Sequence, residues 1–217
     1  MVHAGLFNSE SQLKNRNVSG KKIAFFDFDG TITTKDSLLE IIKFQKGKAA
    51  FYSGFLLHLH WLIAYKLKLI PNDMVKQKVL TYFFAGIPEL VFQENCDLFT
   101  DQILPDIIRP GALTEIDKLR KDGFEMVVVS ASAGNWIRKW TNRLSLELIA
   151  TRLEVKNGLI TGKIEGKNCN GNQKADCIKD RWDLTDYEEV YVYGDSPGDK
   201  PMMTLATKSF YQPFRTT

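Results

Sequence analysis

The chain contains one short segment in which an apolar run ends in two acidic residues, and no other segment restricts the fold as strongly. Residues 23–26 are predicted to form a buried strand, and Asp27 and Asp29 follow it directly. Carboxylates beside a buried strand are unfavourable unless a cation neutralises them. Gly30 allows a sharp turn, whose N–H groups can bind an anion. The segment therefore predicts a strand that ends at a metal or phosphate site, whereas a simple Asx turn would need only one of the two acids.

Three later segments each bring polar side chains that could complete this site. They are the apolar run 127–129 before Ser130, the helical segment that contains Lys174, and the apolar run 190–193 before Asp195 and Asp199. In an open parallel sheet, ligands bind beyond the carboxyl ends of the strands. We therefore expect all of these side chains to meet at one edge of one sheet.

In this order, the segments resemble the motifs of the haloacid dehalogenase superfamily. The four motifs are residues 27–31, Ser130, Lys174 and residues 194–199, and their combination is much more specific than any one of them. The resemblance is to the phosphoserine-phosphatase-like branch. It implies an α/β fold, with a Rossmann-like parallel-sheet core and a small helical cap domain inserted after the first motif.

The resemblance and the sequence patterns together divide the chain into three parts. Residues 1–20 are polar without a period and are expected to be a flexible N-terminal tail. The catalytic core is expected to comprise residues 21–43 and 109–217, where helical and strand patterns alternate as in α/β proteins. Residues 44–108 are expected to form the helical cap.

Local patterns predict individual elements of this fold. Residues 37–40 have the Ser-x-x-Glu form of a capping box, which predicts a helix from about residue 37 to about residue 46. Alternating apolar residues on both sides of Asn157 and Gly158 predict a β-hairpin with a type I′ turn. An edge strand is expected at residues 209–212.

Residues 51–70 are more apolar than a surface helix requires, and their polar side chains are scattered around the helix. Two lysines and two histidines in this segment argue against a helix that crosses a membrane. The interpretation that we prefer is one or two buried cap helices, with aromatic side chains facing the substrate or the core. The alternative is an interfacial segment that meets a membrane surface.

Composition and charge exclude few functions, and the cysteines favour a reducing compartment. The chain has 217 residues and a formal net charge of +3, without a run of five basic residues, so nothing supports binding to nucleic acid. Cys96, Cys169 and Cys177 are odd in number, form no Cys-x-x-Cys pair, and follow no signal-like segment. We therefore expect a cytoplasmic location; the sequence carries no information about the oligomeric state.

The resemblance implies an Mg²⁺-dependent phosphatase, that is, a phosphoric monoester hydrolase. Phosphate esters repel anionic nucleophiles, so catalysis depends on charge neutralisation and positioning. By resemblance, Asp27 attacks phosphorus and forms an aspartyl phosphate, while Asp29 protonates the leaving group and later activates water. Ser130 and Lys174 are the remaining catalytic residues, and they contact the phosphoryl oxygens and offset their charge.

The resemblance also assigns metal-binding and substrate-binding roles. Carboxylates with water suit Mg²⁺, and the metal ligands are the side chains of Asp27 and Asp195 and the backbone carbonyl of Asp29. Asp199 is either a direct ligand or a group that orients a metal-bound water or the lysine. A helix N-cap ahead of Pro201 is the other interpretation of Asp199, and it is compatible with the first. Substrate-binding residues are Phe28 and Ala131, through their N–H groups, and Asp36. The Asp36 carboxylate either contacts a substrate amine or only stabilises the start of a helix.

The substrate is expected to be a small phosphorylated metabolite, a small-molecule phosphate ester. One alternative substrate is a lipid phosphate, similar to phosphatidylglycerophosphate or lysophosphatidate, which residues 51–70 would contact at a membrane surface. An alternative reaction is that of a phosphomutase. A non-catalytic binding module ranks last, because all the motif residues are present. Asp29 disfavours the dehalogenase branches, which lack an acid at this position. Ser196 stands where phosphoserine phosphatases have glycine, and no cap segment matches their substrate-binding arginine, so the resemblance does not extend to phosphoserine as the substrate.

Overall fold

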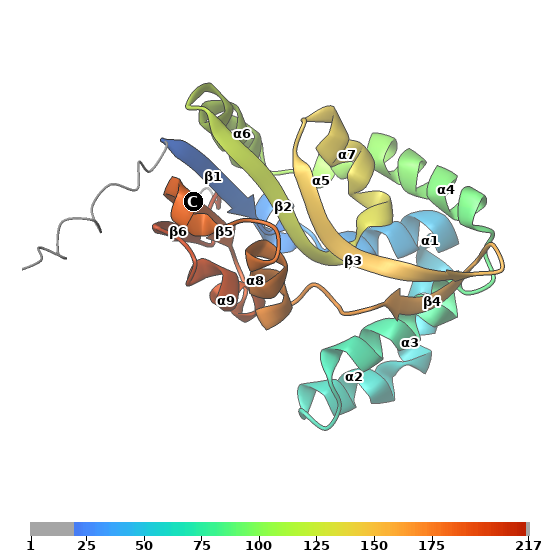
Figure 1. Ribbon diagram of the computed structural model, residues 1–217. Helices are drawn as coiled ribbons and strands as arrows, with labels where there is room; N and C mark the ends of the chain where they lie inside the picture. Colours follow the sequence, from blue (N-terminus) through green and yellow to red (C-terminus); the bar gives the residue numbers. More distant parts are fainter. Residues whose placement is uncertain (1–19, 216–217) are drawn as a thin grey trace, which may run out of the picture.

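The computed structural model describes residues 20–215, which form a six-stranded sheet covered by helices (Figure 1). The predicted N-terminal tail lies almost entirely outside this range. The strands are β1 (Lys21–Phe26), β2 (Phe124–Ala133), β3 (Glu147–Lys156), β4 (Leu159–Glu165), β5 (Tyr187–Gly194) and β6 (Lys208–Tyr211). Their order is β4-β3-β2-β1-β5-β6, and all neighbours are parallel except β3 and β4. The expected α/β fold with a Rossmann-like parallel sheet is confirmed.

The central strands are buried on both faces, as parallel sheets require. In β1, Ala24 and Phe26 belong to one apolar cluster, and Ile23 and Phe25 belong to another on the opposite face. This alternation follows from the two-residue period of a strand. The first cluster includes residues of α6 (Pro110–Lys121), and the second includes residues of α8 (Asn172–Lys179) and α9 (Lys200–Met203). The helices therefore hold β1 in the middle of the core, with its carboxyl end free for a site.

Five helices lie between β1 and α6, where the resemblance placed a cap. They are α1 (Ser37–Leu57), α2 (Leu59–Lys66), α3 (Asn72–Phe84), α4 (Glu89–Gln102) and α5 (Leu104–Ile107). The residues of α1 after Ser37 are helical as far as Gly47, which has a φ of 80° and kinks the helix. The predicted helical end near residue 46 thus coincides with this kink. The remaining elements are a turn at η1 (Phe28–Ile32), α7 (Arg138–Arg143), and the short turns η2 (Gly134–Trp136), η3 (Leu184–Asp186) and η4 (Pro197–Asp199).

The predicted hairpin is confirmed as the connection between β3 and β4. Asn157 and Gly158 have φ values of 52° and 73°, as a type I′ turn requires. The edge strand predicted at residues 209–212 occurs one residue earlier, as β6, which pairs with β5 only.

The preferred interpretation of residues 51–70 as buried helices is wrong for α2. Phe51 and Gly54 on α1 are buried, but α2 contains no buried residue. The reason is that α2 packs mainly against α1 and α3, and the elements within residues 20–215 leave its outer sides exposed. Figure 1 shows α2 and α3 at the lower tip of the molecule, away from β1, β2 and β5. Apolar composition predicts burial only where neighbouring elements are available to cover it.

Candidate active site

Asp27 lies at the carboxyl end of β1, where it forms an ion pair with the lysine of α8. Its backbone N–H donates to the carbonyl of Tyr193 at 2.9 Å, which fixes the end of β1 against β5. The Lys174 Nζ donates to Asp27 Oδ1 at 2.5 Å and to Asp199 Oδ1 at 2.7 Å. The Thr31 hydroxyl donates to Asp27 Oδ2 at 3.1 Å. Residues separated by 147 positions in the sequence thus meet at one buried point.

This cluster is short of positive charge. Burial raises the pKa of Asp27 to about 7, although the Lys174 ammonium opposes the shift. Burial alone would lower the pKa of Lys174, but the Asp27 and Asp199 carboxylates raise it above its ordinary value. One ammonium therefore serves two buried carboxylates. A further cation would stabilise the group, because uncompensated buried charge is unfavourable.

Asp195 and Asp199 follow β5 and approach Asp27 from the neighbouring strand. Asp199 Oδ2 accepts hydrogen bonds from the Asp195 N–H at 3.1 Å, from the Ser196 N–H at 2.9 Å and from the Ser196 hydroxyl at 2.8 Å. Burial and the nearby Asp199 raise the pKa of Asp195, while Arg215, whose guanidinium lies 3.0 Å from Asp195 Oδ2, opposes this shift. The carboxylates therefore stay together because hydrogen bonds from the turn at η4 hold Asp199 in place.

The three carboxylates fit a divalent metal ion. Asp27, Asp195 and Asp199 each offer one oxygen atom, and these atoms lie within 4.8 Å of one another. Hard oxygen donors of this kind suit Mg²⁺. Asp199 Oδ1 accepts from Lys174, and Asp199 Oδ2 accepts from the turn, so Asp199 orients the lysine beside this cluster.

Gly30 makes the close approach of the first and last motifs possible. A Cβ atom at this position would lie 2.3 Å from Asp195 Oδ2, and the φ of Gly30 is 83°. No other residue type could occupy the position without moving the carboxylate. The glycine is therefore required both by the turn and by the neighbouring acid.

Asp29 is held by residues that the sequence analysis did not select. The Ser132 hydroxyl donates to Asp29 Oδ2 at 2.5 Å, and the backbone N–H of Ser37 donates to Asp29 Oδ1 at 2.7 Å. The Ser37 hydroxyl donates in turn to Ser132 Oγ at 3.2 Å and accepts from the Trp136 indole at 3.0 Å. This relay fixes the orientation of the Asp29 carboxylate. The spacing could have revealed Ser132, because residues two apart on a strand share a face with Ser130.

Ser130 lies near the carboxyl end of β2 and is fully buried. Its Oγ accepts a hydrogen bond from the Ser132 N–H at 3.0 Å. The Phe28 side chain is also fully buried, 5.6 Å from the Trp140 ring centroid, so only its backbone could contact a ligand.

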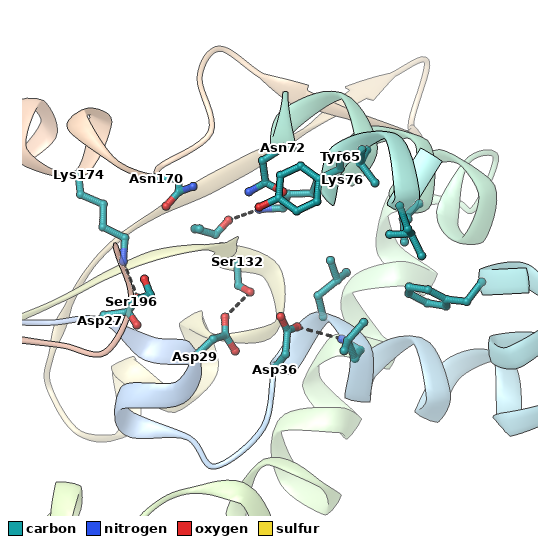
Figure 2. A pocket seen from close by; sticks show the side chains of 17 residues that line it. Asp27, Asp29, Asp36, Tyr65, Asn72, Lys76, Ser132, Asn170, Lys174 and Ser196 are labelled. Carbon is teal, nitrogen blue, oxygen red and sulfur yellow. Dashed lines mark hydrogen bonds and ion pairs between the residues drawn. The ribbon is translucent and has the colours of Figure 1, made fainter. Parts of the chain in front are cut away.

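A cavity of about 320 Å³ opens beside these residues, and Figure 2 shows its lining. Of the predicted site residues, Asp27, Asp29, Asp36, Ala131 and Lys174 line it, together with Ser132 and Ser196. Phe28, Ser130, Asp195 and Asp199 do not belong to this lining. The cavity therefore has one acidic side, where the first motif ends.

Lys76 on α3 extends into the same cavity and was not identified from the sequence. Its Nζ donates to the Ala131 carbonyl and, at 2.9 Å, to Asn168 Oδ1. Removal from water lowers the pKa of Lys76 to about 8, while Asp29 and Asp36 oppose the shift. Figure 2 shows Lys76 across the cavity from Asp29 and Asp36. The sequence does not distinguish Lys76 from the other lysine of the same helix, Lys78, which is exposed, and so it did not predict that Lys76 lines the cavity.

Asp36 caps α1 and also lines the cavity, so both interpretations of this residue agree with its position. Its carboxylate accepts a hydrogen bond from the Leu39 N–H at 3.1 Å. Partial removal from water and the nearby Asp29 raise the pKa of Asp36. The capping role is therefore observed, and contact with a substrate stays a prediction.

Residues 24–204 match the family model of haloacid dehalogenase-like hydrolases, and the chain belongs to this family. The protein CicA of Caulobacter vibrioides is 30% identical over 192 residues, which cover 88% of this chain and 85% of the relative. Phosphoserine phosphatase SerB2 of Mycobacterium tuberculosis is 25% identical over 191 residues, which cover 86% of this chain and 42% of the relative. A structure of a phospho-aspartyl intermediate analogue of phosphoserine phosphatase is 21% identical, with a TM-score of 0.63, and the match covers 87% of this chain and 85% of that chain. The chain is a phosphatase of the phosphoserine-phosphatase-like branch, as its motifs predicted.

Proposed function

We propose that this chain is an Mg²⁺-dependent phosphomonoesterase that hydrolyses a small phosphorylated metabolite through an aspartyl phosphate on Asp27. The observation that carries the proposal is the buried ion pair between Asp27 and Lys174, beside two further carboxylates at the end of the neighbouring strand. Residues 44–108, which comprise the later part of α1 and helices α2 to α5, would act as the cap over a core of residues 21–43 and 109–217.

The proposed reaction proceeds in two steps. An Asp27 carboxylate oxygen forms a bond to phosphorus while the ester O–P bond breaks, and Asp29 transfers its proton to the departing alkoxide. Water then attacks phosphorus, Asp29 accepts a proton from it, and the bond between phosphorus and Asp27 breaks to release inorganic phosphate. The hydrogen bonds from Ser132 and Ser37 support this assignment, because they hold Asp29 beside the cavity.

Charge neutralisation would come from the remaining motif residues. Asp27, Asp195 and the Asp29 backbone carbonyl would hold Mg²⁺, which supplies positive charge against the phosphoryl oxygens. The contacts of Lys174 support a role in offsetting the charge of Asp27. Ser130 and the N–H groups of Phe28 and Ala131 would donate to the phosphoryl oxygens.

The central test is the variant Asp27→Asn, assayed by Mg²⁺-dependent release of phosphate from a generic aryl phosphate. Loss of the nucleophile should lower kcat at least about a thousandfold. Asp117→Asn, on the exposed face of α6, is the matched control and should retain activity. Turnover of Asp27→Asn near the wild-type rate would remove Asp27 from the nucleophile role.

A second candidate function is hydrolysis of a lipid phosphate, which the apolar side of the cavity favours. This side includes Phe55, Leu62, Tyr65, Val75 and Val79. Glycerol 3-phosphate and lysophosphatidate form a matched pair of substrates, because they share the phosphate ester and differ by an acyl chain. A higher kcat/KM for glycerol 3-phosphate would support the metabolite, and a higher value for lysophosphatidate would support the lipid.

A further inference from the structure

The lower tip of the molecule exposes a continuous group of apolar side chains on the end of α1, on α2 and on the turn that follows. We call residues 52–69 the apolar tip. Its most exposed leucines include Leu56, Leu67 and Leu69, with exposed fractions of 72%, 63% and 73%, and Leu57, Leu59 and Ile63 are also exposed. Side chains of this size are seldom grouped on a surface unless another surface covers them.

The exposed side chains of the apolar tip point in several directions. Leu59 and Ile63 are four residues apart and share one face of α2, while Leu56 and Leu57 are adjacent and diverge around the helix axis. A partner protein with one flat face would cover only some of these positions. A bilayer interface can surround a projecting tip on all sides.

The segment that contains the apolar tip carries charge of one sign, and the next acidic residue along the chain is Asp73, at the start of α3. Residues 41–72 include no aspartate or glutamate, but they include five lysines: Lys43, Lys46, Lys48, Lys66 and Lys68. Lys66 and Lys68 are exposed beside the leucines. The full chain has a net charge of only +3, so this positive charge is local. Clustered lysines beside an apolar surface complement anionic lipid headgroups.

We propose that the apolar tip binds the surface of an anionic lipid bilayer. The leucines lie at the boundary between headgroups and acyl chains, and Lys66 and Lys68 contact the lipid phosphates. Within residues 20–215, no helix combines the length and the apolar character needed to cross a bilayer, so this contact is with one leaflet only. The inference concerns a surface outside the candidate active site and does not depend on the proposed reaction.

Membrane binding at the tip would also affect access to the cavity. Phe55 on α1 and Leu62 and Tyr65 on α2 line the cavity and belong to the same segment as the exposed leucines. Figure 2 shows the Tyr65 side chain at the cavity, near Asn72 and Lys76. The bound membrane would therefore lie next to one wall of the cavity.

The test is flotation of the full chain with phosphatidylcholine vesicles that contain or lack phosphatidylglycerol. We expect the chain to float with the vesicles that contain phosphatidylglycerol, and to float less at high salt. The double variant Leu57→Ser/Leu67→Ser should reduce the bound fraction at least about tenfold, and Lys66→Glu/Lys68→Glu should abolish the preference for phosphatidylglycerol.

The matched control is Leu90→Ser on α4. Leu90 has an exposed fraction of 79% but lies outside the apolar tip, so this variant should float like the wild type. Hydrolysis of an aryl phosphate, measured in parallel, should be equal in all these variants and shows that they are folded. A failure of the proposed phosphatase reaction would leave the flotation result unchanged.

Two results would overturn the proposal. One is equal flotation of the wild type and the Leu57→Ser/Leu67→Ser variant, or no flotation of either. The other is a concentration-dependent dimer in sedimentation velocity that the leucine substitutions abolish, together with no vesicle binding. That outcome would assign the apolar tip to a second copy of this chain.

Discussion

The Asp29 carboxylate receives hydrogen bonds from two separate elements, a backbone N–H of α1 and a hydroxyl of β2. Such a group is restricted to one orientation, which proton transfer requires. Its contribution can be measured with leaving groups of different basicity. An alkoxide needs a proton as it departs, whereas a nitrophenolate does not.

We predict that Asp29→Asn lowers kcat far more for an alkyl phosphate than for 4-nitrophenyl phosphate. Ser132→Ala should reduce kcat for the alkyl phosphate by about tenfold to a hundredfold, because a hydrogen bond to a charged group contributes about 1.5–3 kcal/mol. Thr114→Ala, which removes an exposed hydroxyl on α6, is the control. Equal losses with both substrates would contradict a general-acid role for Asp29.

Lys76 provides a prediction about pH. Its pKa of about 8 means that the ammonium is charged below this pH and becomes neutral above it. If the charge attracts an anionic substrate, KM should rise by about tenfold per pH unit above pH 8. Lys76→Met should have a high KM at every pH and no rise in this range. Lys78→Met, two residues along α3 and exposed, should behave like the wild type, and a pH profile unchanged by Lys76→Met would refute the assignment.

At the scale of elements, β4 joins the core sheet to the inserted helices through its contact with α3. Gly162 on β4 makes this approach possible, because a Cβ atom there would lie 2.3 Å from the Cα atom of Thr81. The two backbones pack so closely that no side chain fits between them. This junction determines how α3, and therefore Lys76, is placed over the carboxyl ends of the strands.

We predict that Gly162→Ala destabilises the protein by about 3 kcal/mol, from left-handed backbone strain and steric overlap together. Gly158→Ala is the matched control, because Gly158 has a similar positive φ of 73° but nothing within 4 Å of an added Cβ. The free energy of unfolding of Gly158→Ala should be only about 1–2 kcal/mol below that of the wild type. Urea denaturation of both variants measures the difference, and equal losses would show that the contact with Thr81 is unimportant.

At the scale of the whole molecule, the cluster of Asp27, Asp195 and Asp199 joins segments from both ends of the described chain. Asp27 follows the first strand, and Asp195 follows the fifth. A bound cation would therefore connect distant parts of the chain and stabilise the native state. This effect is independent of turnover.

We predict that saturating Mg²⁺ raises the Tm by about 5–10 °C, because a ligand at a hundred times its Kd contributes about 2.7 kcal/mol. Asp195→Asn should abolish most of the rise, since it removes a carboxylate from the cluster. The rise in Tm is measured by thermal unfolding of the wild type and of Asp195→Asn, with and without Mg²⁺. An Mg²⁺-dependent rise of the same size in Asp195→Asn would place the ion elsewhere.

Features that depend on short stretches of chain were predictable from the sequence. Asp27, Asp29 and Gly30 lie within four consecutive residues, and their chemical role follows from a buried strand that ends in charged side chains. Asn157 and Gly158 predicted the hairpin because a type I′ turn requires two residues with positive φ. The family and the α/β fold followed from such local motifs in a particular order.

Only the tertiary structure decided which residues from separate segments meet and which side chains stay exposed. Lys76 contacts the Ala131 carbonyl from a helix that precedes it by 55 positions, and no local pattern records such a contact. The apolar residues of α2 predicted burial, but none of them is buried by the elements that the structure describes. Local backbone preferences act over a few residues and are therefore readable in the sequence, whereas burial and charge neutralisation depend on how the whole chain packs.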